Sequence, residues 1–194
     1  MNFEKAVEFH GHECPGLAIG YRAAMVAVER FKERSEDEEL VAIVENNSCA
    51  VDAIQAINGC TFGKGNFIFK DFGKHVYTFF KRGDDIAIRV SLKASSDPAD
   101  DRHRELMKKI SSGNATEEEI KSFKKAHEEK TRRILEVPLE EFFDIKEIKA
   151  DLPEKAKIYR SLICDECGEG VMETRARLAD GKILCIPCFD KDSR

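Results

Sequence analysis

The sequence predicts an α+β protein in which an antiparallel sheet packs with helices, followed by a small cysteine-rich module. Two observations carry this prediction: helical and strand patterns alternate over the first three quarters of the chain, and four cysteines gather near its end. The 194 residues are enough for one well-packed core and one appendage. Pro153 and the polar residues after it indicate a boundary, so we expect domains at 1–155 and 156–194.

The first helical pattern begins directly after Cys14. Pro15 suits the first position of a helix, which makes Cys14 the N-cap residue. The stretch "ELVAIVEN" then predicts a short buried strand, and "SCAVDAIQAING" predicts a second helix, capped by Ser48 and closed by Gly59. Apolar residues at helical spacing give the first helix one buried face: Leu17, Tyr21, Ala24, Met25, Val28 and Phe31.

The middle of the chain contains three β-rich runs, in "GNFIFKDFGKHVYTFFKRGDDIAIRVSL", which we interpret as a meander of antiparallel strands. A hairpin of two charged helices should follow. Its first helix starts at Asp97-Pro98, and its second starts at Thr116 with a capping box and ends before Pro138. Ten acidic and ten basic residues balance each other in this hairpin, which favours a structural role. "FFDIKEIKADLP" predicts one more strand.

Composition narrows the class of protein. A formal net charge of −5 argues against a nucleic-acid partner, and no apolar run approaches the ~20 residues that cross a bilayer. The charged N-terminal stretch is unlike a signal peptide, so we expect a cytoplasmic protein with reduced cysteines. Seven cysteines, an odd number, then indicate metal ligands and free thiols more than disulfides.

Four of these cysteines form two Cys-x2-Cys pairs separated by seventeen residues. Two such pairs are typical of a structural zinc site; iron is the chemical competitor, and four free thiols are the alternative. Gly168 permits a tight turn after the first pair, and Asp180-Gly181 predicts a hairpin between the pairs. The segment carries more acidic than basic residues, which favours protein contact over nucleic-acid binding. The predicted zinc ligands are Cys164, Cys167, Cys185 and Cys188.

A second cluster of potential metal ligands lies in "FHGHECPG". If this stretch is extended, then His10, His12 and Cys14 point the same way, because side chains alternate between faces. The N-cap position should also lower the pKa of the Cys14 thiol. In the second helix Cys49 and Asp52 share a face.

The loop after the second helix adds Cys60 and a lysine, Lys64, between two glycines. It departs from the phosphate-binding P-loop pattern, so we exclude nucleotide hydrolysis, but Lys64 could still hold an anionic group or simply occupy a turn. We therefore predict an open metal site with His12, Cys14 and Cys60 as ligands. Cys49 and His10 are the nearest substitutes, Asp52 would orient a ligand, and a metal-free thiol cleft is the alternative.

These motifs carry a family resemblance. His-Gly-His-x-Cys-Pro-Gly, the long motif from Cys49 to Asn66 and "DFGK" resemble the FmdE family of formylmethanofuran dehydrogenase proteins over roughly residues 3–150. The resemblance implies an α+β core, sometimes followed by a treble-clef zinc finger, and self-association as a homodimer. It also implies association with the molybdenum or tungsten enzyme of methanogens that fixes carbon dioxide on methanofuran. The motif residues that it carries over are His10, His12, Cys14, Cys49, Asp52, Gln55, Cys60, Thr61, Gly63, Lys64 and Asn66.

Two functional hypotheses follow. The first is a metal- or thiol-site protein in one-carbon or molybdenum/tungsten-enzyme metabolism, with zinc in the tail and a second zinc or other transition metal in the core. The second is a non-catalytic dimeric adaptor that uses the zinc finger for protein contact. Turnover and substrate stay open, and neither hypothesis involves nucleic acid or a membrane. For the first hypothesis the candidate catalytic residues are His10, Cys14, Cys49, Asp52, Gln55 and Lys64.

Overall fold

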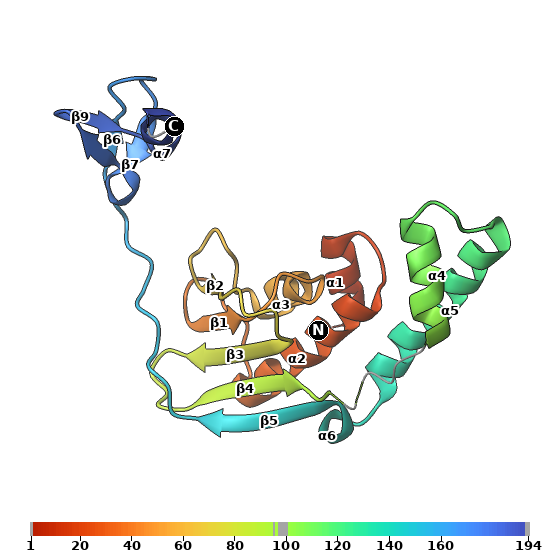
Figure 1. Ribbon diagram of the computed structural model, residues 1–194. Helices are drawn as coiled ribbons and strands as arrows, with labels where there is room; N and C mark the ends of the chain where they lie inside the picture. Colours follow the sequence, from red (N-terminus) through yellow and green to blue (C-terminus); the bar gives the residue numbers. More distant parts are fainter. Residues whose placement is uncertain (1, 95, 97–100, 193–194) are drawn as a thin grey trace. The chain divides into compact units, whose positions relative to one another are not determined.

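The computed structural model describes residues 2–94, 96 and 101–192 (Figure 1). The chain divides into two compact units, Met1–Lys155 and Ala156–Arg194, and the division falls in the polar segment after Pro153. None of the described helices is long and apolar enough to span a membrane.

The first unit is built on a five-stranded sheet with strand order β2-β1-β3-β4-β5. Neighbouring strands are antiparallel except for β1 and β2, which run parallel. Figure 1 shows β3, β4 and β5 as adjacent arrows. The strands are β1 (Leu40–Val44), β2 (Phe67–Phe69), β3 (Val76–Lys81), β4 (Ala87–Leu92) and β5 (Phe143–Ile148).

The predicted meander is therefore wrong for its first strand. β3 and β4 do form an antiparallel hairpin, and β5 pairs with β4 as an added strand. β2, however, pairs with β1, with Ala42 opposite Phe67. The helix α3 (Ala50–Asn58) connects these two strands, and a strand–helix–strand crossover brings the second strand back in parallel. The continuous apolar run of β1 reflects burial on both faces of the strand, because Leu40, Ala42 and Val44 belong to the main core and Val41 belongs to a second buried cluster.

Two helices cover the sheet at its centre. α2 (Pro15–Phe31) packs against β3 and β4, and α3 packs against β1. Gly20 lets α2 and α3 approach closely, because a Cβ atom there would lie 2.0 Å from the carbonyl oxygen of Ala50. The largest completely buried side chains of this core include Leu17, Leu40, Ile54, Ile57, Tyr77, Phe79 and Phe143.

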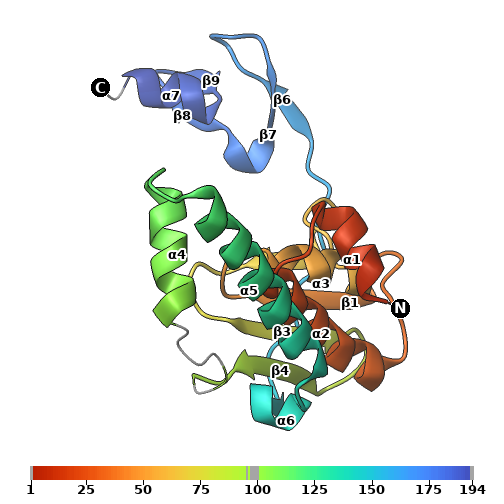
Figure 2. The same cartoon turned by 90° about the vertical axis from the view of Figure 1, so that its right-hand side faces the viewer.

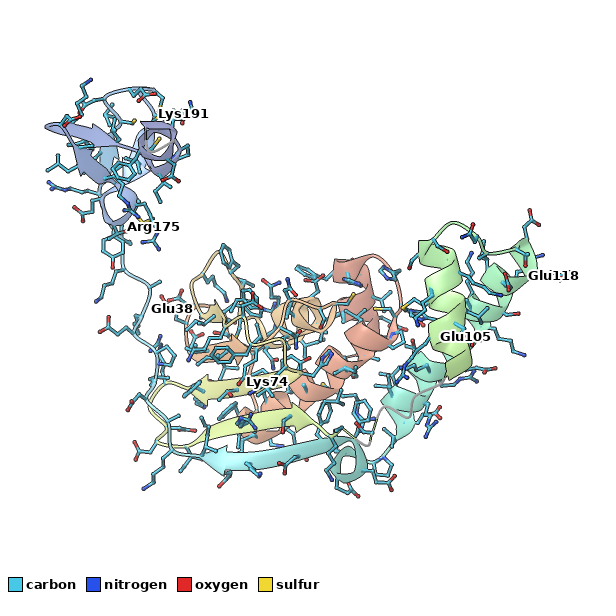
Figure 3. The ribbon with its side chains drawn as sticks, viewed as in Figure 1. Glu38, Lys74, Glu105, Glu118, Arg175 and Lys191 are labelled. Atoms are coloured by element: carbon cyan, nitrogen blue, oxygen red, sulfur yellow. The ribbon has the colours of Figure 1, made fainter. Side chains whose placement is uncertain are left out.

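The charged helical hairpin consists of α4 (Asp101–Ser111) and α5 (Glu117–Glu136), which lie side by side in Figure 2. The predicted capping box at Thr116 is confirmed, and Figure 3 shows Glu118 at the outer end of the hairpin. The predicted start at Asp97-Pro98 lies outside the described residues. At the other end of α5, the Arg22 guanidinium of α2 donates hydrogen bonds to three backbone carbonyls. A short helix α6 (Leu139–Phe142) leads into β5.

The second unit consists of two small hairpins and a helix. The predicted turn between β8 and β9 is confirmed, with φ of 49° at Asp180 and 75° at Gly181. Its elements are β6 (Ser161–Ile163), β7 (Gly170–Met172), the 3-10 turn η1 (Glu173–Arg175), β8 (Arg177–Ala179), β9 (Lys182–Leu184) and α7 (Ile186–Asp192).

Candidate metal centres

The four C-terminal cysteines converge, as predicted. One ligand atom from each lies within 4.8 Å of the other three. Cys164 and Cys167 lie in the turn between β6 and β7, and Gly168, with a φ of 76°, follows them. Cys185 directly precedes α7, and Cys188 lies in its first turn. Backbone N–H groups of Cys167 and Cys185 lower the pKa of the Cys164 thiol to about 6. Four thiolate donors at these distances suit a tetrahedral zinc ion.

The N-terminal cluster lies where three helix ends meet. His10 is the last residue of α1 (Phe3–His10), Cys14 is the N-cap of α2, and Cys49 is the N-cap of α3. The N-cap prediction for Cys14 is confirmed, because its sulfur accepts a hydrogen bond from the backbone N–H of Leu17 at 3.3 Å. The ends of three different helices thus bring one imidazole and two thiol side chains close together.

The prediction of an extended "FHGHEC" stretch is wrong, because α1 continues to His10. Gly11 ends this helix with a φ of 96° and redirects the chain toward α2. The helical signal was present in the sequence, since Phe3, Ala6 and Val7 have helical spacing and pack in the core. His10, His12 and Cys14 still form one group, with ligand atoms within 4.8 Å of one another.

Asp52 orients the first histidine of this group. The Nδ1 atom of His10 lies 2.7 Å from a carboxylate oxygen of Asp52, and its Nε2 atom lies 3.9 Å from the sulfur of Cys14. The rings of His10 and His12 lie 4.5 Å apart between centroids. A tetrahedral zinc ion places a nitrogen and a sulfur ligand ~3.6 Å apart, from bond lengths of about 2.1 and 2.3 Å. The His10–Cys14 separation is thus close to what a shared ion requires.

Cys49 lies beside this group. A Cβ atom placed on Gly16 would be 3.8 Å from the Cys49 sulfur and 3.9 Å from the Cys14 sulfur. The four-residue spacing of Gly16 and Gly20 was the sequence signal for this close approach of α2 and α3, and it was missed. These two glycines set the position of the Cys49 end of α3.

The expected low pKa of Cys14 is contradicted. Burial raises the pKa of the Cys14 thiol and outweighs the hydrogen bond from Leu17, which lowers it. The neighbouring Cys49 thiol raises the pKa further. Only 5% of Cys14 is exposed, so the helix N-terminus does not compensate for the lost hydration.

The remaining predicted site residues lie at the opposite end of α3. Cys14 lies beside the N-cap end of α3, whereas Cys60 follows the C-cap residue Gly59. The nine helical residues between these ends span ~13 Å at 1.5 Å each, so Cys60 is too far away to share an ion with Cys14. Cys60 is completely buried, and burial raises its pKa to about 12. The group that the structure brings together is therefore His10, His12 and Cys14, and the predicted ligand Cys60 is not part of it.

The loop that follows Cys60 is held by its own backbone and by residues 35–40. Lys64 donates hydrogen bonds to the carbonyl oxygens of Ser35 and Glu36, each at 3.1 Å, so its described partners are backbone groups. The side-chain oxygen of Gln55 accepts from the backbone N–H of Phe62 at 3.2 Å. Asn66 is completely buried, and its amide bonds to the same 35–40 segment. These contacts give the glycine-rich motif a structural explanation.

The comparisons with known proteins define the class of the chain. The family model described as "FmdE, Molybdenum formylmethanofuran dehydrogenase operon" matches residues 9–144, and the model of the prokaryotic dksA/traR C4-type zinc finger matches residues 157–194. The chain therefore belongs to the FmdE family and ends in a C4 zinc finger.

Two individual proteins resemble the chain along most of its length. A "Probable S-adenosyl-L-methionine-binding protein" from Archaeoglobus fulgidus is 34% identical over 192 residues, which cover 95% of this chain. The chain spans about half the length of this curated relative, 51%. The crystal structure of a tungsten formylmethanofuran dehydrogenase FmdE-like protein from Syntrophus aciditrophicus has a TM-score of 0.58 and 23% sequence identity. That match covers 98% of this chain and 91% of the other, and it supports the α+β fold.

Proposed function

We propose that the core unit binds one transition metal ion, preferably zinc, through His10, His12 and Cys14, and that this ion forms a reactive site. The observation that carries the proposal is the pair of contacts made by His10. One ring nitrogen lies against the Asp52 carboxylate, and the other faces the Cys14 sulfur. Histidines that bind metals in proteins commonly hold a carboxylate with their other nitrogen, which fixes the ring and raises its basicity.

The donor set also favours zinc. Two imidazoles and one thiolate are borderline-soft ligands, and three protein ligands leave one position of a tetrahedral ion open for a small molecule. The ion would supply Lewis-acid chemistry at that position. Asp52 would hold His10 in place. Because His12 is exposed, a small molecule from solvent could reach the open position of the ion.

We place this site in one-carbon or molybdenum/tungsten-enzyme metabolism. The support is the family description, which names a molybdenum formylmethanofuran dehydrogenase operon, together with the likeness to the tungsten formylmethanofuran dehydrogenase FmdE-like protein of Syntrophus aciditrophicus. We do not assign S-adenosylmethionine binding, because the Archaeoglobus fulgidus relative that carries this name is about twice as long as the matched region.

A cobalt titration of the full chain tests the metal proposal. In a Cys185→Ser background the finger has lost a ligand, so the core should dominate the binding of Co²⁺. We expect a tetrahedral cobalt spectrum with a sulfur-to-cobalt charge-transfer band at about one Co²⁺ per chain. Adding His12→Ala should remove this spectrum, whereas the control substitution Lys125→Ala, at an exposed position of α5, should not. A folded chain that gives no such spectrum would rule the site out.

The adaptor function is the second candidate, and the surface of the finger favours it. Ile163 and Leu178 are 62% and 75% exposed on this small unit, as expected for a surface that contacts another protein. In this alternative the core serves as a dimerisation unit. Complementation of a deletion strain separates the two functions: an adaptor should tolerate His12→Ala and fail with Leu178→Glu, and a metal-site protein should show the reverse.

A further inference from the structure

We propose that Cys14 and Cys49 form a reversible disulfide that switches the core metal site off under oxidising conditions. The two cysteines occupy equivalent positions, since each is the N-cap of a helix, α2 for Cys14 and α3 for Cys49. The two helices pack closely at this end because Gly20 allows their backbones to approach. The fold therefore brings together two thiols from segments that are 35 residues apart in the sequence.

Gly16 leaves the space beside both sulfurs open. Its hypothetical Cβ atom would lie 3.2 Å from the Cβ of Cys49 and 3.9 Å from the sulfur of Cys14. The Cys49 thiol is close enough to Cys14 to raise the pKa of the Cys14 thiol. A disulfide requires Cβ atoms ~3.8 Å apart and a sulfur–sulfur bond of about 2.05 Å, so a rotation of the two side chains within this open space must precede bond formation.

The exposure of the two thiols sets the order of events. Cys49 is partly exposed, whereas Cys14 is buried. A small oxidant from solvent therefore meets Cys49 first, and the protected Cys14 thiol acts as the resolving partner. Cys60, the third cysteine of this unit, is completely buried at the opposite end of α3 and takes no part.

The oxidant that we name is a peroxide. The Cys49 thiolate attacks one oxygen of hydrogen peroxide and the O–O bond breaks. The departing hydroxide takes up the proton that the Cys49 thiol released on ionisation, so the products are a sulfenic acid and one water molecule. The Cys14 sulfur then attacks the sulfenic sulfur, the sulfur–sulfur bond forms, and the hydroxyl group leaves as a second water molecule. Two thiols are oxidised and one peroxide is reduced. A small dithiol reverses the reaction by two exchange steps and becomes a disulfide itself.

The effect on the metal rests on the proposed function, whereas the disulfide itself does not. Cys14 is the thiolate of the proposed ligand set, and a disulfide sulfur no longer offers a negative charge to an ion. His10 and His12 alone are too few to retain zinc against water and competing chelators. Peroxide should therefore release the core metal, and a dithiol should restore binding.

Peptide mapping of the full chain tests the disulfide directly. The reduced, metal-loaded protein is treated with one equivalent of hydrogen peroxide, the remaining thiols are alkylated, and the chain is cut after Lys/Arg and before Asp. This digestion places Cys14 in residues 6–22, Cys49 in 37–51 and Cys60 in 52–64, so each pairing gives a distinct mass. We expect the linked pair 6–22 and 37–51.

The metal count of the same samples tests the switch. Cys49→Ser is the matched control, because it keeps all three proposed ligands and the same finger but cannot form the bond. After peroxide and gel filtration, the wild-type chain should hold about one metal ion fewer than Cys49→Ser, and dithiol with added zinc should close this difference. Absence of the Cys14–Cys49 peptide, or equal metal loss in both proteins, would overturn the proposal. If the peptide forms but reduced protein binds zinc only in the finger, the proposed function and its switch both fail.

Discussion

The contact between α2 and α3 gives the sharpest test of the packing that forms the N-terminal site. In Gly20→Ala the new Cβ atom would lie 2.0, 2.5 and 2.6 Å from the carbonyl oxygen, Cα and carbonyl carbon of Ala50. All three are backbone atoms, so no side-chain rotation can relieve the overlap. The helices must separate, which shifts Cys49 and Asp52 away from the α2 end that carries Cys14.

Two opposing contributions decide the size of the effect. Overpacking a close contact costs ~1–3 kcal/mol, and a backbone clash belongs at the upper end of this range. Replacing glycine by alanine inside a helix stabilises the folded state by about 1 kcal/mol, because alanine has the higher helix propensity. The net loss of stability should thus be ~2 kcal/mol, which lowers the melting temperature of a unit of this size by about 4–8 °C.

Urea unfolding followed by circular dichroism measures this loss, with Gly63→Ala as the matched control. No described atom lies within 4 Å of a Cβ atom on Gly63, so the control should stay within ~0.5 kcal/mol of wild type. A Gly20→Ala chain that is as stable as wild type, or more stable, would refute the close-packing argument.

Three further predictions follow. Asp52→Asn should weaken zinc binding by the core by about 10–100-fold, measured by chelator competition, because the amide cannot hold His10 as a carboxylate does; unchanged affinity would separate Asp52 from the site. Cys185→Ser should release the finger zinc and unfold residues 156–194 while the core keeps its melting transition, since so small a unit depends on its metal; an ordered finger in that variant would contradict this. Burial raises the Cys60 pKa to about 12 from its ordinary 9.0, so the unfolded chain loses this proton at lower pH than the folded chain does. The free energy of unfolding should therefore fall between pH 9 and 12, and Cys60→Ala should make this fall shallower. An identical pH profile in the variant would count against the buried thiol.

Local signals in the sequence were reliable guides to the structure. The capping box at Thr116, the turn at Asp180-Gly181 and the N-cap at Cys14 each depend on residues within four positions of one another, and all three are present. The four-cysteine module was equally predictable, because the ligand spacing specifies the metal site almost independently of the rest of the chain.

Longer-range features were harder to predict. The parallel pairing of β2 with β1 depends on sheet order, which no local pattern encodes. The wrong ligand Cys60 came from treating the loop after α3 as free to fold back, although the length of that helix already places Cys60 ~13 Å from Cys49. The role of Lys64 was missed because its partners are backbone carbonyls of a distant segment.

The metal content of the purified 194-residue chain tests the central claim most directly. Elemental analysis after reduction and loading with zinc should give about two zinc ions per chain in the wild type, one in the finger and one in the core. The double variant His12→Ala, Cys14→Ser should hold about one, with the finger intact. One zinc ion per chain in both proteins, with the core folded, would contradict the core site and leave only a thiol cleft there.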